Sequence, residues 1–91
     1  MKPKPQRFED VLEFPCDFTF RVVADASDAV RTVCEAVITE VLSRAPLSTN
    51  VKPSRKGNFA VYRITARVES GDQIRQIYGA LVNVEGVRTL L

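Results

Sequence analysis

Two segments of this chain carry apolar residues at helical spacing along one side only. In the first segment, residues 28–44, the pattern i, i+3, i+4, i+7 is filled by Val30, Val33, Cys34, Val37, Ile38, Val41 and Leu42. In the second segment the same spacing is filled by Ile74, Ile77, Tyr78, Leu81 and Val82. A helix with one apolar stripe buries that stripe against another layer. The sequence therefore predicts two amphipathic helices that cover one apolar surface.

Short polar signals mark the ends of these helices. Ser27 is a favourable N-cap for the first helix, and Pro46 stops it after Arg44 complements the negative end of its dipole. Ser70 and Gln73 have the spacing of a capping box, in which the Gln73 side chain reaches back to the Ser70 backbone N–H. We expect the second helix to begin directly after Ser70.

The segments around the helices alternate with a period of two, which is typical of half-buried strands. We expect strands at residues 14–24, 49–54, 59–69 and 84–91, with a short lead-in helix at residues 8–13. The turn between the second and third strands is residues 55–58, where Gly57 and Asn58 accept a positive φ. In the third strand the uncharged set faces the helices: Ala60, Tyr62, Ile64, Ala66 and Val68.

The resulting order is β-α-β-β-α-β, which predicts an α+β, ferredoxin-like fold. We expect a four-stranded antiparallel sheet with both helices on one face, so that the other face is left for solvent, a ligand or a partner. Residues 8–91 are expected to form a single domain, and residues 1–7 a flexible basic tail. No apolar run is long enough for a signal peptide or a membrane span, so we expect a cytoplasmic location and no membrane partner.

The chemistry of the side chains argues against catalysis. The 91 residues include no histidine, which removes Ser/His and Cys/His nucleophilic mechanisms and imidazole metal ligands. Cys16 and Cys34 lie 18 positions apart, and we interpret both as small buried hydrophobic residues. We therefore expect no enzyme, no metal site and no cofactor.

Charge is divided unevenly along the chain. Residues 8–45 hold eight acidic and three basic residues, whereas residues 46–68 hold five basic residues and no acidic one. The hairpin is thus a basic pole and the first helix with its neighbours an acidic pole. A basic hairpin either discourages edge-to-edge aggregation or forms a contact surface for an anionic ligand or an acidic protein.

Several motifs resemble those of one family. The opening Leu12-Glu13-Phe14-Pro15, the hairpin residues 51–54 and Lys56-Gly57-Asn58, Tyr78 and the ending Val87-Arg88 resemble the YbeD-like small bacterial proteins. The resemblance covers roughly residues 12–91. It implies a cytosolic protein with a ferredoxin-like fold similar to ACT regulatory domains, and a loose association with lipoyl metabolism. It implies no catalytic residues.

The leading functional hypothesis is a regulatory or adaptor module that binds a protein partner through the basic hairpin or the open sheet face. The candidate contact residues combine cations with exposed apolar side chains: Lys52, Arg55, Lys56, Asn58, Phe59, Val61, Arg63 and Arg67. The open faces of two copies could equally pair in a homodimer.

Two alternatives remain at this point. The first is an ACT-like domain that senses a small molecule at a dimer interface, although the loop at residues 24–28 is acidic and lacks glycine. The second is weak RNA binding, because residues 56–63 begin like the third strand of an RNA-recognition motif. Its stacking positions, however, hold Asn58 and Ala60 instead of aromatic residues, so we do not expect nucleic acid as the main partner.

Overall fold

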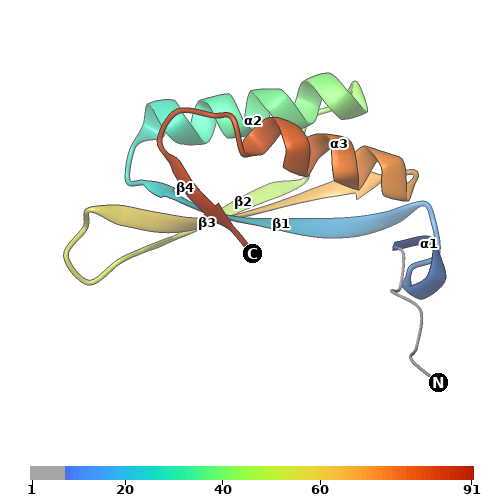
Figure 1. Ribbon diagram of the computed structural model, residues 1–91, viewed down its shortest axis with the longest axis horizontal. Helices are drawn as coiled ribbons and strands as arrows, with labels where there is room; N and C mark the ends of the chain where they lie inside the picture. Colours follow the sequence, from blue (N-terminus) through green and yellow to red (C-terminus); the bar gives the residue numbers. More distant parts are fainter. Residues whose placement is uncertain (1–7) are drawn as a thin grey trace.

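The computed structural model describes residues 8–91, so the expected basic tail at residues 1–7 lies outside the described residues. The elements in chain order are α1 (Phe8–Val11), β1 (Cys16–Asp25), α2 (Asp28–Leu42), β2 (Ser48–Pro53), β3 (Phe59–Val68), α3 (Gly71–Leu81) and β4 (Val87–Leu90). The four strands form one antiparallel sheet in the order β2-β3-β1-β4. Helices α2 and α3 lie on one face of it, and the β2–β3 hairpin extends beyond them (Figure 1). The predicted ferredoxin-like fold is confirmed.

The core lies between the helices and the inner face of β1 and β3. The face of β3 that was expected to meet the helices does so, since its residues are at most 3% exposed: Ala60, Tyr62, Ile64, Ala66 and Val68. They pack with Phe20 of β1 and with Ile38, Ile74 and Ile77 of the two helices, all fully buried. Each such aliphatic side chain contributes about 2 kcal/mol on burial. This face holds the sheet rigidly against the helices and leaves the other face open.

The helix ends follow the expected signals with two corrections. Ser27 caps α2, because its Oγ accepts a hydrogen bond from the Val30 N–H at 3.4 Å. The helix ends at Leu42 and not at residue 44, since Ser43 adopts a left-handed conformation with φ 57°. Ser70 caps α3, but the Gln73 side chain accepts from the N–H of Glu69 (2.7 Å), one residue before the expected one.

Four smaller expectations also need correction. Val33 is 47% exposed, because the predicted stripe is wider than the surface that α2 buries. Cys34 is buried as expected, whereas Cys16 at the start of β1 is only partly buried. The last strand begins at Val87, after a turn in which Gly86 has φ 95°. In the hairpin turn Gly57 alone takes a positive φ, and Asn58 does not.

Candidate anion-binding surface

The open face of the sheet is built from side chains that stand opposite each other on β1 and β3. The Ala26 N–H donates to the Asn58 carbonyl at 3.3 Å, which marks that position as a hydrogen-bonded pair. Along an antiparallel pair of strands the two kinds of pair alternate, so the open-face pairs are of the non-hydrogen-bonded kind. Such pairs bring side chains closest together. They are Asp17–Arg67, Thr19–Thr65, Arg21–Arg63, Val23–Val61 and Asp25–Phe59.

Three of these pairs are directly complementary. Arg67 Nη1 lies 3.2 Å from Asp17 Oδ1, which makes an ion pair. The hydroxyls of Thr19 and Thr65 are hydrogen-bonded at 2.8 Å. Val23 and Val61 place apolar side chains together.

The Asp25–Phe59 pair is completed by a third residue. The register of β1 against β4 shifts between Val23 and Ala24, and this bulge includes Arg88. Arg88 Nε donates to Asp25 Oδ1 at 2.9 Å, and the same guanidinium lies 5.5 Å from the centre of the Phe59 ring. The bulge therefore directs one arginine to satisfy both members of the pair.

The Arg21–Arg63 pair is the exception. Non-hydrogen-bonded partners have Cα atoms only about 4.5 Å apart, and like charges placed directly opposite are destabilising. Among residues 8–91, no carboxylate lies within ion-pair distance of either guanidinium. Both side chains are exposed.

The charge of Arg21 also acts on a neighbouring tyrosine. Burial raises the pKa of Tyr78, and the positive charge of Arg21 acts against that rise.

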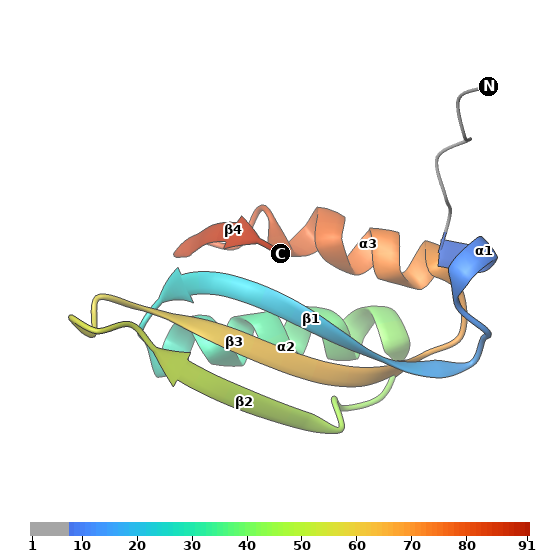
Figure 2. The same ribbon diagram turned by 90° about the horizontal axis from the view of Figure 1, so that it is seen from below.

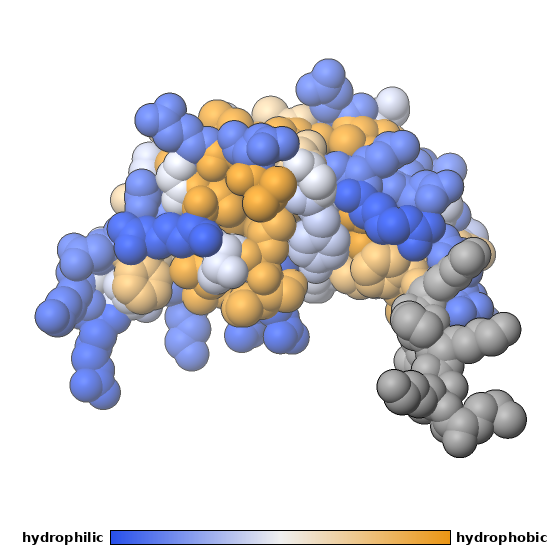
Figure 3. All heavy atoms as spheres, in the orientation of Figure 1, coloured by the Kyte–Doolittle hydropathy of each residue, from blue (hydrophilic) through white to orange (hydrophobic). Residues whose placement is uncertain are grey.

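A shallow hollow of about 310 Å³ surrounds this pair. Its lining combines three cations with apolar and hydroxyl groups: Arg21, Lys52, Pro53, Ser54, Phe59, Val61, Arg63 and Leu91. Guanidinium groups offer planar sets of donors that match carboxylate or phosphate oxygens. Hydrophilic side chains project below the sheet and from the hairpin, whereas hydrophobic ones gather over β4 (Figure 3). The arrangement can bind an oxyanion next to an apolar group.

The structure divides the eight predicted contact residues into three groups. Lys52, Phe59, Val61 and Arg63 line the hollow. The turn holds Arg55, Lys56 and Asn58, beyond the end of β2. Arg67 lies at the opposite end of the open face, where Asp17 neutralises it.

One residue of this surface, Arg21, was not predicted. Its place on the polar side of β1 follows from the alternation of that strand, but its charge lies in the acidic part of the sequence. Only the register of β1 against β3 shows that Arg21 stands opposite Arg63. No local pattern in the sequence predicts that register.

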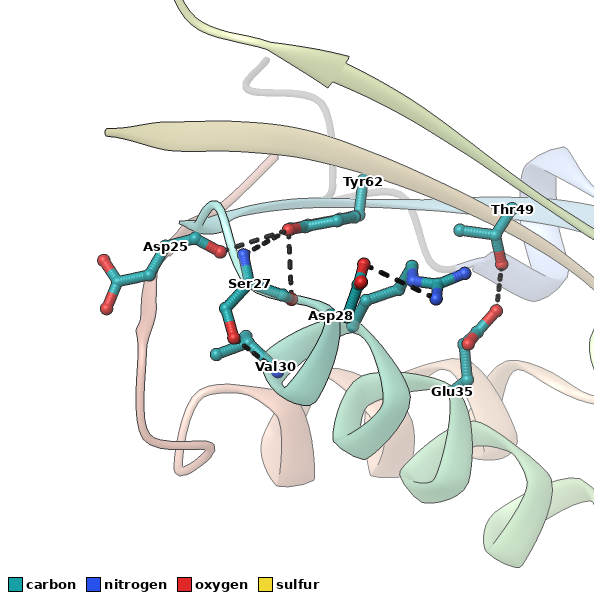
Figure 4. A network of polar contacts seen from close by, with 8 residues as sticks. Asp25, Ser27, Asp28, Val30, Glu35, Thr49 and Tyr62 are labelled. Carbon is teal, nitrogen blue, oxygen red and sulfur yellow. Dashed lines mark hydrogen bonds and ion pairs between the residues drawn. The ribbon is translucent and has the colours of Figure 1, made fainter. Parts of the chain in front are cut away.

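The loop between β1 and α2 is hydrogen-bonded to the side chain of Tyr62, which extends from β3 on the helix side of the sheet. The Tyr62 hydroxyl accepts from the Ser27 N–H at 3.1 Å and lies 3.1 and 3.3 Å from the carbonyls of Asp25 and Ser27 (Figure 4). Nearby, the Thr49 hydroxyl donates to the Glu35 carboxylate, which connects β2 to α2. The backbone polar groups of this loop are thus engaged within the chain.

The alignment with an RNA-recognition strand fails in the structure. Ala60, which stands at one of the stacking positions, faces the helices and is 1% exposed. The neighbouring Phe59 does lie on the open face, but Arg88 covers part of its ring.

The fold and the open basic face define a small ferredoxin-like protein with a candidate anion-binding sheet. The family described as "Protein of unknown function (DUF493)" matches residues 9–91. The UPF0250 protein of Shewanella oneidensis is 40% identical over 87 residues, which cover 93% of this chain and 96% of that protein. The chain belongs to this DUF493/UPF0250 family, which confirms the resemblance to YbeD-like proteins.

Solved structures show the same fold at low sequence identity. Protein HP0495 from H. pylori aligns with a TM-score of 0.70 and 19% identity, over 97% of this chain and 88% of that one. The C-terminal domain of the MgtC protein from Mycobacterium tuberculosis aligns with a TM-score of 0.60 and 14% identity, over 82% of each chain.

The described residues offer neither a metal-ligand cluster nor a membrane-spanning helix. Within residues 8–91, no group of three or more cysteine, aspartate or glutamate side chains is arranged to hold a metal ion. In the same part of the chain, every helix is too short or too polar to cross a membrane.

Proposed function

We propose that this chain is a regulatory or adaptor module that binds an acidic segment of a partner protein on its open sheet face. The observation that carries this proposal is the Arg21–Arg63 pair. Three of the five open-face pairs between β1 and β3 are complementary, a fourth is satisfied by Arg88, and this one is not. Two exposed arginines at directly opposed register positions cost stability, and a carboxylate bound to either of them would reduce that cost.

The surroundings of the pair favour a protein over a free ion. Phe59 is 37% exposed, and Val61 lies on the same face between Phe59 and Arg63. Aromatic and arginine side chains side by side are enriched among the residues that contribute most to protein interfaces. Lys52, Arg55 and Lys56 extend the positive charge along the hairpin, which speeds encounter with an acidic surface.

The test is affinity capture from native extract at moderate salt, with quantification of the retained proteins. The bait is the wild-type chain or the double variant Arg21→Gln/Arg63→Gln, which removes the repulsion as well as the charge. The matched control is Arg44→Glu, which changes net charge by the same two units in the loop after α2, away from the open face, and gives up one exposed ion pair with Glu69. We expect the wild type and the control to retain the same proteins and the double variant to lose them.

Two results would contradict the proposal. If the double variant retained the same proteins as the wild type, the pair would have no role in recognition. If wild type and variants all retained nothing specific, the open face would not be a protein-binding surface, and thermal-shift screening of small anionic metabolites would follow.

A further inference from the structure

We infer that the acidic partner segment binds as an extended strand added to the free edge of β2, with its carboxylates on the side of Lys52 and Arg63. This inference rests on the proposed function and gives the partner segment a conformation and a side-chain pattern. It is carried by the backbone of β2, the exposure of that strand and the charge on its two sides.

The backbone of β2 has unpaired groups at its outer edge. The Ser54 N–H donates to the Phe59 carbonyl at 2.9 Å, so Ser54 and the alternate residues before it point their backbone groups toward β3. Thr49, Val51 and Pro53 therefore direct theirs away from the sheet. Proline has no N–H, so the outward backbone groups that can pair with a further strand are the N–H groups of Thr49 and Val51 and the carbonyls of Thr49, Val51 and Pro53. In Figure 2 no other helix or strand of residues 8–91 borders β2 on that side.

This edge is protected at one end only, by Lys52 and Pro53, and the rest of β2 carries neither charge nor proline. Five of its six residues are exposed, and apolar Leu47 and Val51 are 59% and 45% exposed. Long, open edges are sites where another strand adds, and proteins block them unless they are used. On the helix side, a groove of about 810 Å³ between α2 and the start of β2 is bordered by Ser48 and Thr49.

The two sides of β2 select different side chains. Asn50 and Lys52 stand opposite Arg63 and Val61, so they lie on the open face. Thr49 and Val51 stand opposite buried residues of β3 and lie on the helix side. An added strand would therefore place every second side chain near Lys52 and the others near Val51. That pattern fits a segment in which acidic and apolar residues alternate.

Arg63 is within reach of such a strand, although it belongs to the next strand inward. Neighbouring strands lie about 4.8 Å apart, so Arg63 stands roughly 10 Å from the added backbone, a gap that one arginine and one glutamate side chain can bridge. Arg21 is one strand further away. Its charge repels the Arg63 guanidinium and favours conformations of Arg63 that lean toward β2 and the partner.

The probe is the synthetic peptide acetyl-Thr-Glu-Val-Glu-Val-Glu-Thr-amide. A peptide of the same composition with its glutamates grouped together serves as the control for pattern. Binding is measured by nuclear magnetic resonance titration, and amide hydrogen exchange is followed at Thr49 and Val51. Two new backbone hydrogen bonds correspond to about tenfold in affinity or more. We expect slower exchange at both amides with the alternating peptide and weaker binding of the grouped one.

The variant Val51→Pro removes an outward N–H without removing a bond to β3, and should weaken binding about tenfold. A second measurement leaves the protein intact: peptides methylated at single backbone nitrogens should lose affinity at alternate positions only. Unchanged affinity in both tests would overturn strand addition. If strand addition were overturned in this way but Arg21→Gln/Arg63→Gln still failed to bind the peptide, the proposed function would stand without strand addition.

A second copy of this chain is the other occupant that the test detects. Sedimentation of the wild type and of Val51→Pro reports whether the edge is already used for self-association. A wild-type dimer that Val51→Pro converts to a monomer would assign the edge to a second copy and overturn the inference.

Discussion

The two ends of the open sheet face carry arginines in the same strand, on the same side, four residues apart, but in opposite circumstances. Arg67 faces Asp17 and is neutralised at 3.2 Å, whereas Arg63 faces Arg21. Residue type, strand and sheet face are the same, and although Arg63 is exposed and Arg67 half-buried, the main difference is the partner across the strand. An arginine that is satisfied inside the fold has little left for a ligand, and an arginine opposed by another arginine is available to bind an anion.

The largest effect is expected from giving Arg63 the kind of partner that Arg67 already has. Arg21→Glu would place a carboxylate opposite Arg63 and supply internally the group that a partner would bring. Coupling between close charge pairs at interfaces is about 1.5 kcal/mol or more, so affinity for the alternating peptide should fall about tenfold or further. Isothermal titration against wild type and Arg44→Glu measures it, and equal affinity in all three proteins would remove Arg63 from the site.

The reverse exchange should cost stability. Asp17→Arg would create a second arginine pair, Arg67 against the introduced arginine, and would also break the existing ion pair. We expect a loss of about 1 kcal/mol in the free energy of unfolding, because an exposed favourable pair becomes an unfavourable one. Urea unfolding provides the value. Glu85→Arg, a matched change at an exposed site in the turn before β4, should stay within about 0.5 kcal/mol of wild type.

Arg21→Glu, the same change that weakens binding, should make the protein more stable. It replaces a repulsive cross-strand pair by an attractive one at an exposed position, for a gain of about 0.5 kcal/mol. In a chain of this size that corresponds to a rise of roughly 2–4 °C in Tm. A fall in Tm would mean that the Arg21 and Arg63 side chains already avoid each other at no cost, and the argument from their repulsion would fail.

The sequence predicted one of these two ends better than the other. The charge pattern selects Lys52 and Arg63, because residues 46–68 hold five cations and no acid, whereas Phe59 is selected as an exposed aromatic side chain beside Arg63. The alternation of β3 also placed its charged residues away from the helices. Arg67 was selected by the same reasoning, yet it is paired. A charge count along the chain cannot separate Arg63 from Arg67, because their partners come from β1, some forty to fifty residues earlier.

The same limit applies to other features of the fold. Helical stripes, strand alternation and cap residues are local patterns, and they predicted the order of elements and the buried face of β3. The contacts that decide fine detail are not local. Gln73 binds the Glu69 N–H instead of that of Ser70, and Arg88 reaches Asp25 only because a bulge turns it there. Register and bulges arise from packing of the whole sheet.

The smallest predicted effect is a difference in how salt changes the stability contributed by the Arg21–Arg63 and Asp17–Arg67 pairs. At about 1 M salt the Debye length is near 3 Å, so both the Arg21–Arg63 repulsion and the Asp17–Arg67 attraction are screened. Salt should therefore stabilise the wild type relative to Arg21→Gln by a few tenths of a kcal/mol, since only the wild type contains the repulsion. It should stabilise Asp17→Asn relative to the wild type by a similar amount, because that variant has no ion pair to lose. Thermal unfolding across a salt series measures both differences. Parallel curves for all three proteins would show that cross-strand charge does not distinguish the two ends of the sheet.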